Sequence, residues 1–136
     1  QVIDHMLALT GDPSGTGTGN SGKFLLDEHM LPGARHGLRG SLVMAKLPMG
    51  GENLGTFIPN SGSSQFAILL MPILAVSEDQ TVFGRVIEGM DAVSRLRRID
   101  PSKKKAKGEK TFPPDSIVEA TVVRKPDSLP EPRYAR

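Results

Sequence analysis

The stretch from Gly62 to Met90 constrains the fold more than any other part of the chain. It contains an apolar run from Phe66 to Val76, a polar turn from Ser77 to Gln80, and a second apolar segment from Thr81 to Ile87. Short apolar runs that are rich in Ile, Leu, Val and Phe and separated by turn residues are typical of buried strands. We therefore expect two buried strands, joined by a loop, at the centre of the fold.

The glycine and proline content indicates the same class of fold. The chain has 136 residues, of which 15 are Gly and 11 are Pro. So many turn-forming and helix-breaking residues disfavour a helical bundle. A chain of this length supports one domain with a modest core. The composition therefore favours a single, turn-rich, mainly β domain.

Local patterns predict the remaining elements. Gln1 to Thr10 and Gly40 to Leu47 are predicted to be strands, and Asp91 to Arg98 an amphipathic helix. Ser116 to Lys125 alternates apolar and polar residues, which predicts a closing strand. Pro126 to Arg136 is rich in proline and charge, so we expect a disordered tail that follows a domain of residues 1–125.

Several classes of protein are excluded or disfavoured by composition. The absence of cysteine excludes disulfides, thiolate catalysis and Cys-ligated metals, and it leaves the cellular compartment open. The longest apolar run, Phe66 to Val76, contains Pro72 and is far shorter than the ~20 residues of a spanning helix, so no membrane anchor is expected. A net charge of +2 does not imply a nucleic-acid partner. We expect a monomer that has no cofactor.

Three short patterns could carry chemistry, and each has a simpler structural interpretation. Gly17 to Lys23 matches most of a phosphate-binding loop, but Phe24 replaces the required hydroxyl and Pro32 ends any following helix. The histidines do not have the spacing of a zinc site: they are His5, His29 and His36. A run of lysines is typical of a solvated loop: Lys103, Lys104, Lys105, Lys107 and Lys110.

Longer motifs occur along the chain in a fixed order. They are Gly11-Asp12-Pro13, Gly22-Lys23-Phe24 with Asp27-Glu28, Gly40 to Ala45, Ser64-Gln65-Phe66, Val82 to Val86, and Glu88 to Asp91. This order resembles the cyclophilin family of peptidyl-prolyl isomerases, and the resemblance extends from Gln1 to about Lys125. It implies a mainly β fold, an antiparallel barrel with capping helices. The family's opening hairpin and first helix would precede Gln1, so we expect a barrel that is incomplete at its N-terminus and residues upstream in the native product.

The chemistry that the resemblance implies is rotation about the peptide bond before proline. The rotation barrier is about 18–20 kcal/mol for peptide bonds generally, and uncatalysed exchange takes tens to hundreds of seconds. A protein lowers this barrier without a metal or cofactor if an apolar pocket holds the proline and a cationic group donates to the prolyl nitrogen. The implied partner is a proline-containing peptide or protein segment.

The resemblance also places the family's site on particular residues. The implied catalytic positions are Gln1, Met6, Gln65, Ala67 and Gln80. The implied peptide-binding positions are Leu7, Leu9, Ala45, Lys46, Ala75 and Val76. Only Gln65 and Ala45 keep the family's residue. Among the substituted positions, Gln1 stands in place of an arginine and Ala67 in place of a pocket phenylalanine. A charge-assisted hydrogen bond is roughly twice as strong as a neutral one, and each lost ring removes on the order of 1–3 kcal/mol of contact.

These substitutions leave two functions open. One is a cyclophilin-type isomerase with weak or lost activity, and the other is a catalytically inactive cyclophilin fold that binds a peptide or protein. A structural domain without a ligand is a third interpretation. A proline-sized hollow beside the implied catalytic residues would favour the isomerase. The connection from Lys46 to Gly62 is about ten residues longer than the family's, by default a surface insertion, and three of its residues could cover the groove: Leu54, Phe57 and Ile58.

Overall fold

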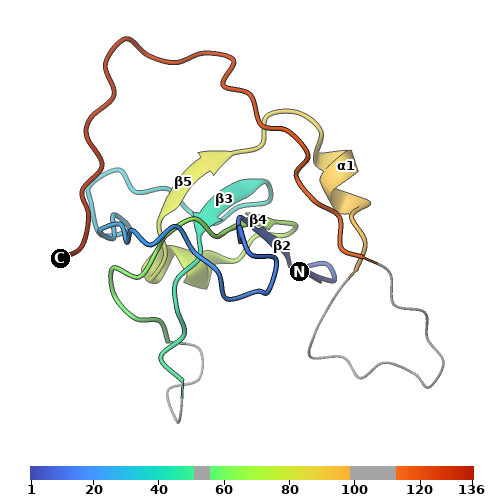
Figure 1. Cartoon of the computed structure of the whole chain (residues 1–136), viewed down its shortest axis with the longest axis horizontal. Helices are drawn as coiled ribbons and strands as arrows, with labels where there is room; N and C mark the ends of the chain where they lie inside the picture. Colours follow the sequence, from blue (N-terminus) through green and yellow to red (C-terminus); the bar gives the residue numbers. More distant parts are fainter. Residues whose placement is uncertain (51–55, 99–112) are drawn as a thin grey trace.

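The computed structural model describes residues 1–50, 56–98 and 113–136 (Figure 1). Five short antiparallel strands form one sheet in the order β1-β2-β4-β3-β5. The strands are β1 Val2–Ile3, β2 Leu7–Thr10, β3 Ser41–Met44, β4 Phe66–Leu69 and β5 Val82–Arg85. The helical elements are a 3-10 helix, η1 Leu74–Glu78, and a short α-helix, α1 Met90–Ser94. The mainly β prediction is confirmed, and β1 and β5 lie at the two edges of the described sheet.

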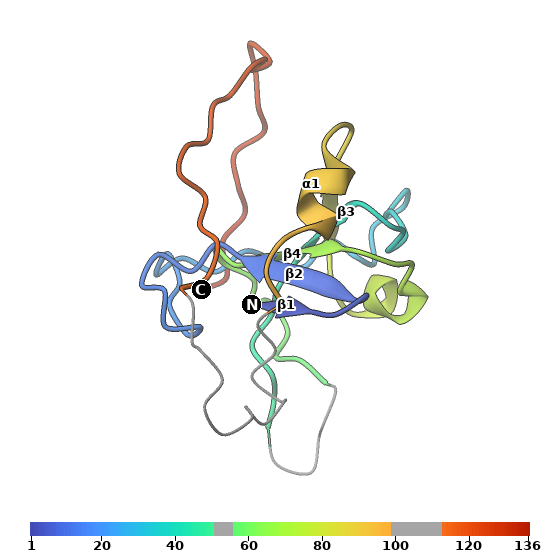
Figure 2. The same ribbon diagram turned by 90° about the vertical axis from the view of Figure 1, so that its right-hand side faces the viewer.

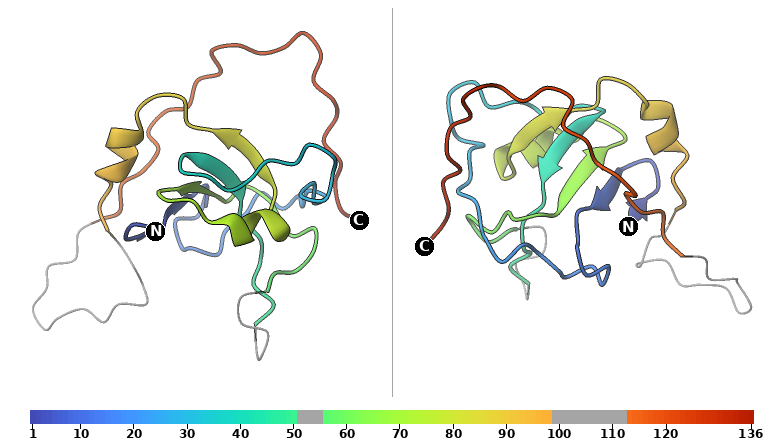
Figure 3. Two further views of the ribbon diagram at one scale, coloured as in Figure 1. Left: turned by 180° about the vertical axis from the view of Figure 1, so that it is seen from behind. Right: turned by 45° about the horizontal axis from the view of Figure 1, so that its top comes forward.

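The two faces of the sheet are covered by different helices. On one face, Val43, Leu69 and Val82 form a buried cluster against which Ile73 and Val76 pack, so we call it the η1 face (Figure 3, left). On the opposite face, the buried residues Val2, Ala8 and Leu70 contact the apolar side of α1, which gives the α1 face (Figure 2). Successive residues of a strand point to opposite faces, so β2 and β4 contribute residues to both clusters.

The central apolar run forms one strand and one helix. β4 ends at Leu69, and residues 74–78 form η1, whereas the sequence pattern predicted a strand through the run. Pro72 lies between the two elements and has no backbone N–H with which to continue a strand ladder. The second predicted strand is present as β5. The predicted amphipathic helix is shorter than expected, but its apolar residues Met90, Val93 and Leu96 do pack on the α1 face.

The predicted closing strand at residues 116–125 is not formed. The segment is extended and exposed, with Val118 94% and Val123 96% accessible, and it arches away from the sheet (Figure 1). A strand requires a neighbour that supplies backbone hydrogen bonds. No described strand pairs with this segment, so the alternating pattern alone does not produce sheet structure.

The end of the chain lies beside the segment of residues 24–26. The Leu26 N–H donates to the Arg133 carbonyl at 3.0 Å, and the Ala135 N–H donates to the Phe24 carbonyl at 2.8 Å. The Lys23 Nζ lies 5.4 Å from the centre of the Tyr134 ring. Disorder of the tail 126–136 stays a prediction. Within this tail, residues 133–135 make the contacts described above. The lysine run 103–110 and Leu54 lie outside the described residues.

Candidate functional site

A row of paired residues brings several predicted site residues together on the η1 face. The N-terminal nitrogen of Gln1 donates to the Leu9 carbonyl at 3.0 Å, and the Leu9 N–H donates to the Gln1 carbonyl at 2.8 Å. Leu9 is opposite Ala67 in the β2–β4 pair. One step further along the neighbouring strands, the Ala45 N–H donates to the Gln65 carbonyl at 3.1 Å. The sheet therefore gathers Leu9 of β2 and Ala67 of β4 with three residues that flank strands: Gln1 before β1, Ala45 after β3 and Gln65 before β4.

The side chain of Gln65 is bound to the glycine-rich loop that follows β2. Its Nε2 donates to the Gly19 carbonyl at 2.7 Å and to the Gly17 carbonyl at 3.3 Å. The amide donors are therefore committed to the loop. Gly11, which begins this loop, has φ +86°, and a Cβ atom there would overlap the Ser64 carbonyl oxygen. Only glycine fits this close approach between the loop and the segment before β4.

Asp12 organises the same loop. Hydrogen bonds lower the pKa of its carboxyl group from 3.8 to about 2, chiefly the bond from the Ser14 hydroxyl, followed by those from the backbone N–H groups of Ser14, Gly17 and Gly19. Hydrogen bonds to the charged form of a carboxyl group favour that form. Asp12 therefore stays ionised over nearly the whole pH range and fixes the loop that holds Gln65.

The other predicted residues lie away from the row, at the start of β2 and in or just after η1. Met6 lies in the turn between β1 and β2 and is 40% exposed. Leu7 and Val76 are half-buried and pack against the Val43 cluster, so they support the core. Ala75 is exposed, and the Gln80 N–H donates to the Val76 carbonyl at 2.8 Å just after η1.

Lys46 is buried and carries an ion-pair cluster that the sequence did not indicate. Its Nζ donates to Asp27 Oδ2 at 2.8 Å, to Asp79 Oδ1 at 3.1 Å and to the Asp79 carbonyl at 2.8 Å. The Lys46 side chain is 1% exposed, against 15% for Asp27 and 41% for Asp79. These contacts use all three donors of the ammonium group. The side chain thus ties three distant segments together and leaves only the Lys46 backbone to contact a peptide.

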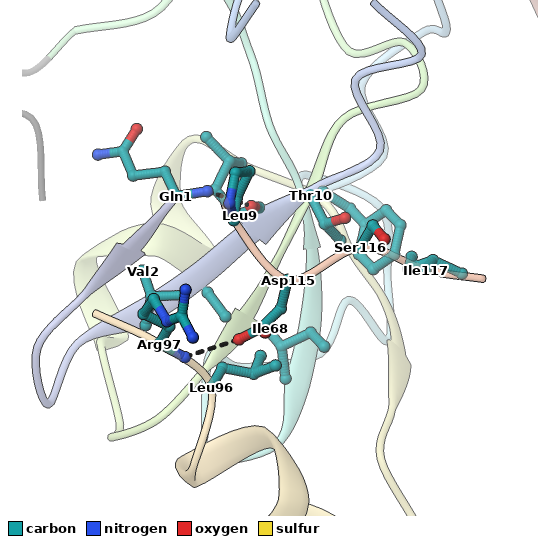
Figure 4. A pocket seen from close by; sticks show the side chains of 13 residues that line it. Gln1, Val2, Leu9, Thr10, Ile68, Leu96, Arg97, Asp115, Ser116 and Ile117 are labelled. Atoms are coloured by element: carbon teal, nitrogen blue, oxygen red, sulfur yellow. Dashed lines mark hydrogen bonds between the residues drawn. The ribbon is translucent and has the colours of Figure 1, made fainter. Parts of the chain in front are cut away.

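Two cavities lie apart from most of the predicted site. One, of about 150 Å³, lies between β1, β2 and residues 113–117 and is lined by Ala8, Ile68 and Ile117 among others (Figure 4). The Arg97 N–H closes one side of it by donating to Asp115 Oδ2 at 2.8 Å, while the Gln1 side chain points away (Figure 4). The second, of about 780 Å³, lies between residues 25–28 and 129–133. Of the predicted site residues, only Gln1 and Leu9 line either cavity.

The alternatives drawn from short motifs gain no support within the described ranges. No helix begins directly after the Gly17 to Lys23 loop, since the next described element is β3. No cluster of three or more His, Asp or Glu side chains in residues 1–50, 56–98 and 113–136 is placed to hold a metal ion. In the same part of the chain, every helix is too short to cross a membrane.

The chain belongs to the family of cyclophilin-type peptidyl-prolyl cis-trans isomerases, with which its mainly β fold agrees. The sequence model of that family, described as cyclophilin type peptidyl-prolyl cis-trans isomerase/CLD, matches residues 1–122. The predicted family is therefore confirmed.

Individual relatives agree with this assignment. Peptidyl-prolyl cis-trans isomerase-like 1 of Neurospora crassa is 33% identical over 129 residues, which cover 93% of this chain and 71% of the relative. The peptidylprolyl isomerase domain and WD repeat-containing protein 1 of Homo sapiens is 33% identical over 126 residues, covering 90% of this chain and 17% of that protein. Peptidyl-prolyl cis-trans isomerase-like 1 also occurs in Aspergillus fumigatus and Gibberella zeae, and the match covers 55% and 72% of the lengths of these two relatives.

Solved structures show the same fold. A cyclophilin-type isomerase of Cryptosporidium parvum, crystallised in the presence of the dipeptide Ala-Pro, superposes with a TM-score of 0.56. The two chains are 26% identical, and the match covers 71% of this chain and 60% of the other.

Proposed function

We propose that this chain binds a proline-containing segment on its η1 face and accelerates rotation about the bond before proline, at a low rate. The observation that carries the proposal is the row in which Gln1, Leu9 and Ala67 meet across paired strands, next to Ala45 and Gln65. The chain belongs to the cyclophilin-type family, and the sequence resemblance assigns the family's site to these residues, which supports the proposal.

The chemistry follows from what the row offers to a twisted peptide bond. When the bond leaves planarity, the prolyl nitrogen regains a lone pair that accepts a hydrogen bond. The exposed Gln1 amide is the donor in the family's arginine position. Its neutral N–H group binds this lone pair more weakly than a cation would. The half-buried aliphatic side chain of Leu9 excludes water from the proline less completely than an aromatic ring would. Both differences favour slow catalysis.

The second candidate, an inactive peptide-binding module, is favoured by one observation. Three positions of the proposed site have little to offer a reacting bond: Ala67 is 6% exposed, the Lys46 side chain is in ion pairs, and the Gln65 donors hold the glycine-rich loop. Such a surface can still contact an extended peptide through its backbone and aliphatic groups. The predicted monomeric state and the predicted lack of a nucleic-acid partner are independent of this choice and stay predictions.

The test is the isomerisation rate of a short Ala-Pro peptide with the natural chain and with Gln1→Arg. We expect weak acceleration by the natural chain and a kcat/KM about tenfold higher for Gln1→Arg, because a charged donor adds about 1.4 kcal/mol in the twisted state. Gln1 is exposed, so the substitution leaves the packing intact.

The control is Met30→Arg, which adds the same charge at a residue that is 81% exposed and outside the proposed site. It should leave the rate unchanged. An inert natural chain that gains activity with Gln1→Arg would support the module in place of the enzyme. No acceleration by any variant, together with no binding of the peptide, would overturn both functions.

A further inference from the structure

The two described ends of the connection between β3 and β4 pair with each other in an antiparallel ribbon. The Ile58 N–H donates to the Leu47 carbonyl at 2.8 Å, and the Met49 N–H donates to the Thr56 carbonyl at 3.0 Å. Pro48 forms an antiparallel bridge with Phe57 between these bonds. The stem extends beyond the end of β3 and away from the sheet (Figure 1). It is built from residues 47–50 and 56–58, and we call it the hairpin stem.

One side of the hairpin stem is apolar and exposed. Residues that face each other across a strand pair, and alternate residues along each strand, share a side. Leu47, Met49 and Ile58 therefore lie on one side, with Pro48 and Phe57 on the other. The three residues are 43%, 52% and 41% exposed. Three large apolar side chains are thus presented together to solvent on a single ribbon.

The base of the stem is fixed by buried polar contacts. The hydroxyl of Ser61, a residue that is 7% exposed, accepts from the Leu47 N–H at 2.9 Å and donates to the Ile58 carbonyl at 2.6 Å. Asp27 Oδ2 accepts from both the Lys46 ammonium at 2.8 Å and the Asn60 N–H at 2.9 Å. These bonds hold both strands of the stem to the body of the domain, so the apolar side has a defined direction.

The apolar side continues directly from the proposed peptide site. Ala45, Leu47 and Met49 are alternate residues, and both ends of this segment make strand-type hydrogen bonds. Lys46, between them, points the opposite way into its ion pairs. At about 3.3 Å per residue, the segment from Ala45 to Met49 is about 13 Å long. A peptide that lies along it would extend about three to four residues beyond the proline.

We propose that the hairpin stem lengthens the proposed peptide-binding surface and selects substrates with large apolar side chains two to four residues from the proline. The occupant is the same extended segment whose proline lies at the η1 face, so this inference rests on the proposed function. Leu47, Met49 and Ile58 determine the preference through contact with these side chains. The stem takes no part in the bond rotation.

The experiment measures the affinity of fluorescently labelled nonapeptides for the full chain. One peptide has Ala-Pro flanked by alanines and serines, and a second has leucines two to four residues on either side of the same Ala-Pro. A third is the leucine peptide with the proline replaced by alanine. We expect the leucine-flanked proline peptide to bind about tenfold more tightly than the alanine-flanked one, which corresponds to the partial burial of two such side chains.

The variants assign this preference to the stem. Leu47→Ser, Met49→Ser should remove the tenfold preference and keep binding of the alanine-flanked peptide. The control, Leu31→Ser, Leu38→Ser, changes two leucines that are each 46% exposed and lie outside the stem, and it should keep the preference. Leu38 precedes β3 whereas the stem follows it.

Each other result overturns the inference in a distinguishable way. If the natural chain binds both proline peptides equally, or if the stem variant keeps the preference, the stem does not select and the proposed function stands. If neither proline peptide binds, the proposed function fails as well. If the leucine peptide without proline binds as tightly as the one with it, the stem is an apolar surface independent of the proline site.

Discussion

Lys46 shows how a single buried charge acquires a structural role. A charged side chain that is 1% exposed is stable only if its charge is compensated, and here two carboxylates and a carbonyl do so. Removing one partner of a buried pair leaves the other charge uncompensated, which is more costly than the pair is stabilising. The cluster therefore makes the fold depend on Asp27 and Asp79.

We predict that Asp27→Asn lowers the free energy of unfolding by about 3 kcal/mol, because Lys46 then keeps only the half-exposed Asp79 as a charged partner. Urea denaturation at neutral pH measures the change. The control is Asp91→Asn, which breaks the Arg95–Asp91 pair at 2.7 Å, whose side chains are 73% and 72% exposed. Its effect should be below about 0.5 kcal/mol. Equal effects of the two substitutions would contradict a structural role for the Lys46 cluster.

At this scale the sequence predicted where residues lie better than what surrounds them. The motif order selects Leu9 and Ala67, and the strand register pairs these two residues across β2 and β4. It gives no signal for the burial of Lys46, because Asp27 and Asp79 are far from it in the chain and meet it only after folding. The sequence also gives no signal for the hydrogen bonds of the Gln65 side chain. Its acceptors are the backbone carbonyl groups of Gly17 and Gly19, which every residue type has.

The loop from Asp12 to Gly19 is the element with the clearest response to pH. The pKa of Asp12 is about 2 in the folded chain and 3.8 as its ordinary value, so the unfolded chain binds this proton more readily. The hydrogen bonds to Asp12 therefore contribute stability that is fully present above about pH 4 and is lost as the pH falls towards 2.

We predict that Ser14→Ala raises the pKa of Asp12 towards 3.8, since the Ser14 hydroxyl is the largest cause of the low value. An NMR titration of the Asp12 side-chain carboxyl carbon measures this directly. The loss of stability between pH 5 and pH 2.5 should become smaller in the variant. Thr18→Ala is the matched control, because the Thr18 hydroxyl contacts Thr16 at 3.1 Å and is not a cause of the Asp12 shift. An unchanged titration in Ser14→Ala would show that the backbone N–H groups alone fix the carboxylate.

Strands were predicted correctly where a segment has both an apolar pattern and a neighbouring strand with which it pairs. β4 and β5 appear where apolar runs predict them, since each pairs with β3. Residues 116–125 have an equally regular alternation and remain without a strand partner among the described residues. Pro72 divides the central run because it has no backbone N–H, and the pattern of apolar residues does not reveal which side of it becomes η1.

At the scale of the whole molecule, the chain's end is attached to the body through residues 24–26. The Leu26 and Ala135 N–H groups form backbone bonds across this junction. Leu25 in the same segment also donates to the Gly62 carbonyl at 2.8 Å, so the segment joins the chain's end to the hairpin base. The sequence predicted a disordered tail here, because prolines and charges dominate and the irregular partner segment has no recognisable pattern.

We predict that deletion of residues 126–136 lowers the free energy of unfolding by about 1–2 kcal/mol and speeds hydrogen exchange at the Leu26 amide, since two backbone bonds are lost. Urea denaturation and exchange measured by NMR test this. Arg133→Ala is the control, because it removes only an exposed ion pair with Glu28 at 3.4 Å and should change stability by less than about 0.5 kcal/mol. An unchanged Leu26 exchange rate after the deletion would instead support the disordered tail.

The Gln65 side chain has a consequence for how occupancy of the η1 face can be detected. Because its amide already holds the carbonyl groups of Gly17 and Gly19, a peptide that recruits this amide competes with the protein's own backbone. When the Gln65 amide donates to such a peptide, it releases the carbonyl groups of the loop. If a peptide binds in this way, we expect the NMR resonances of the glycine-rich loop to shift even when no bond is isomerised.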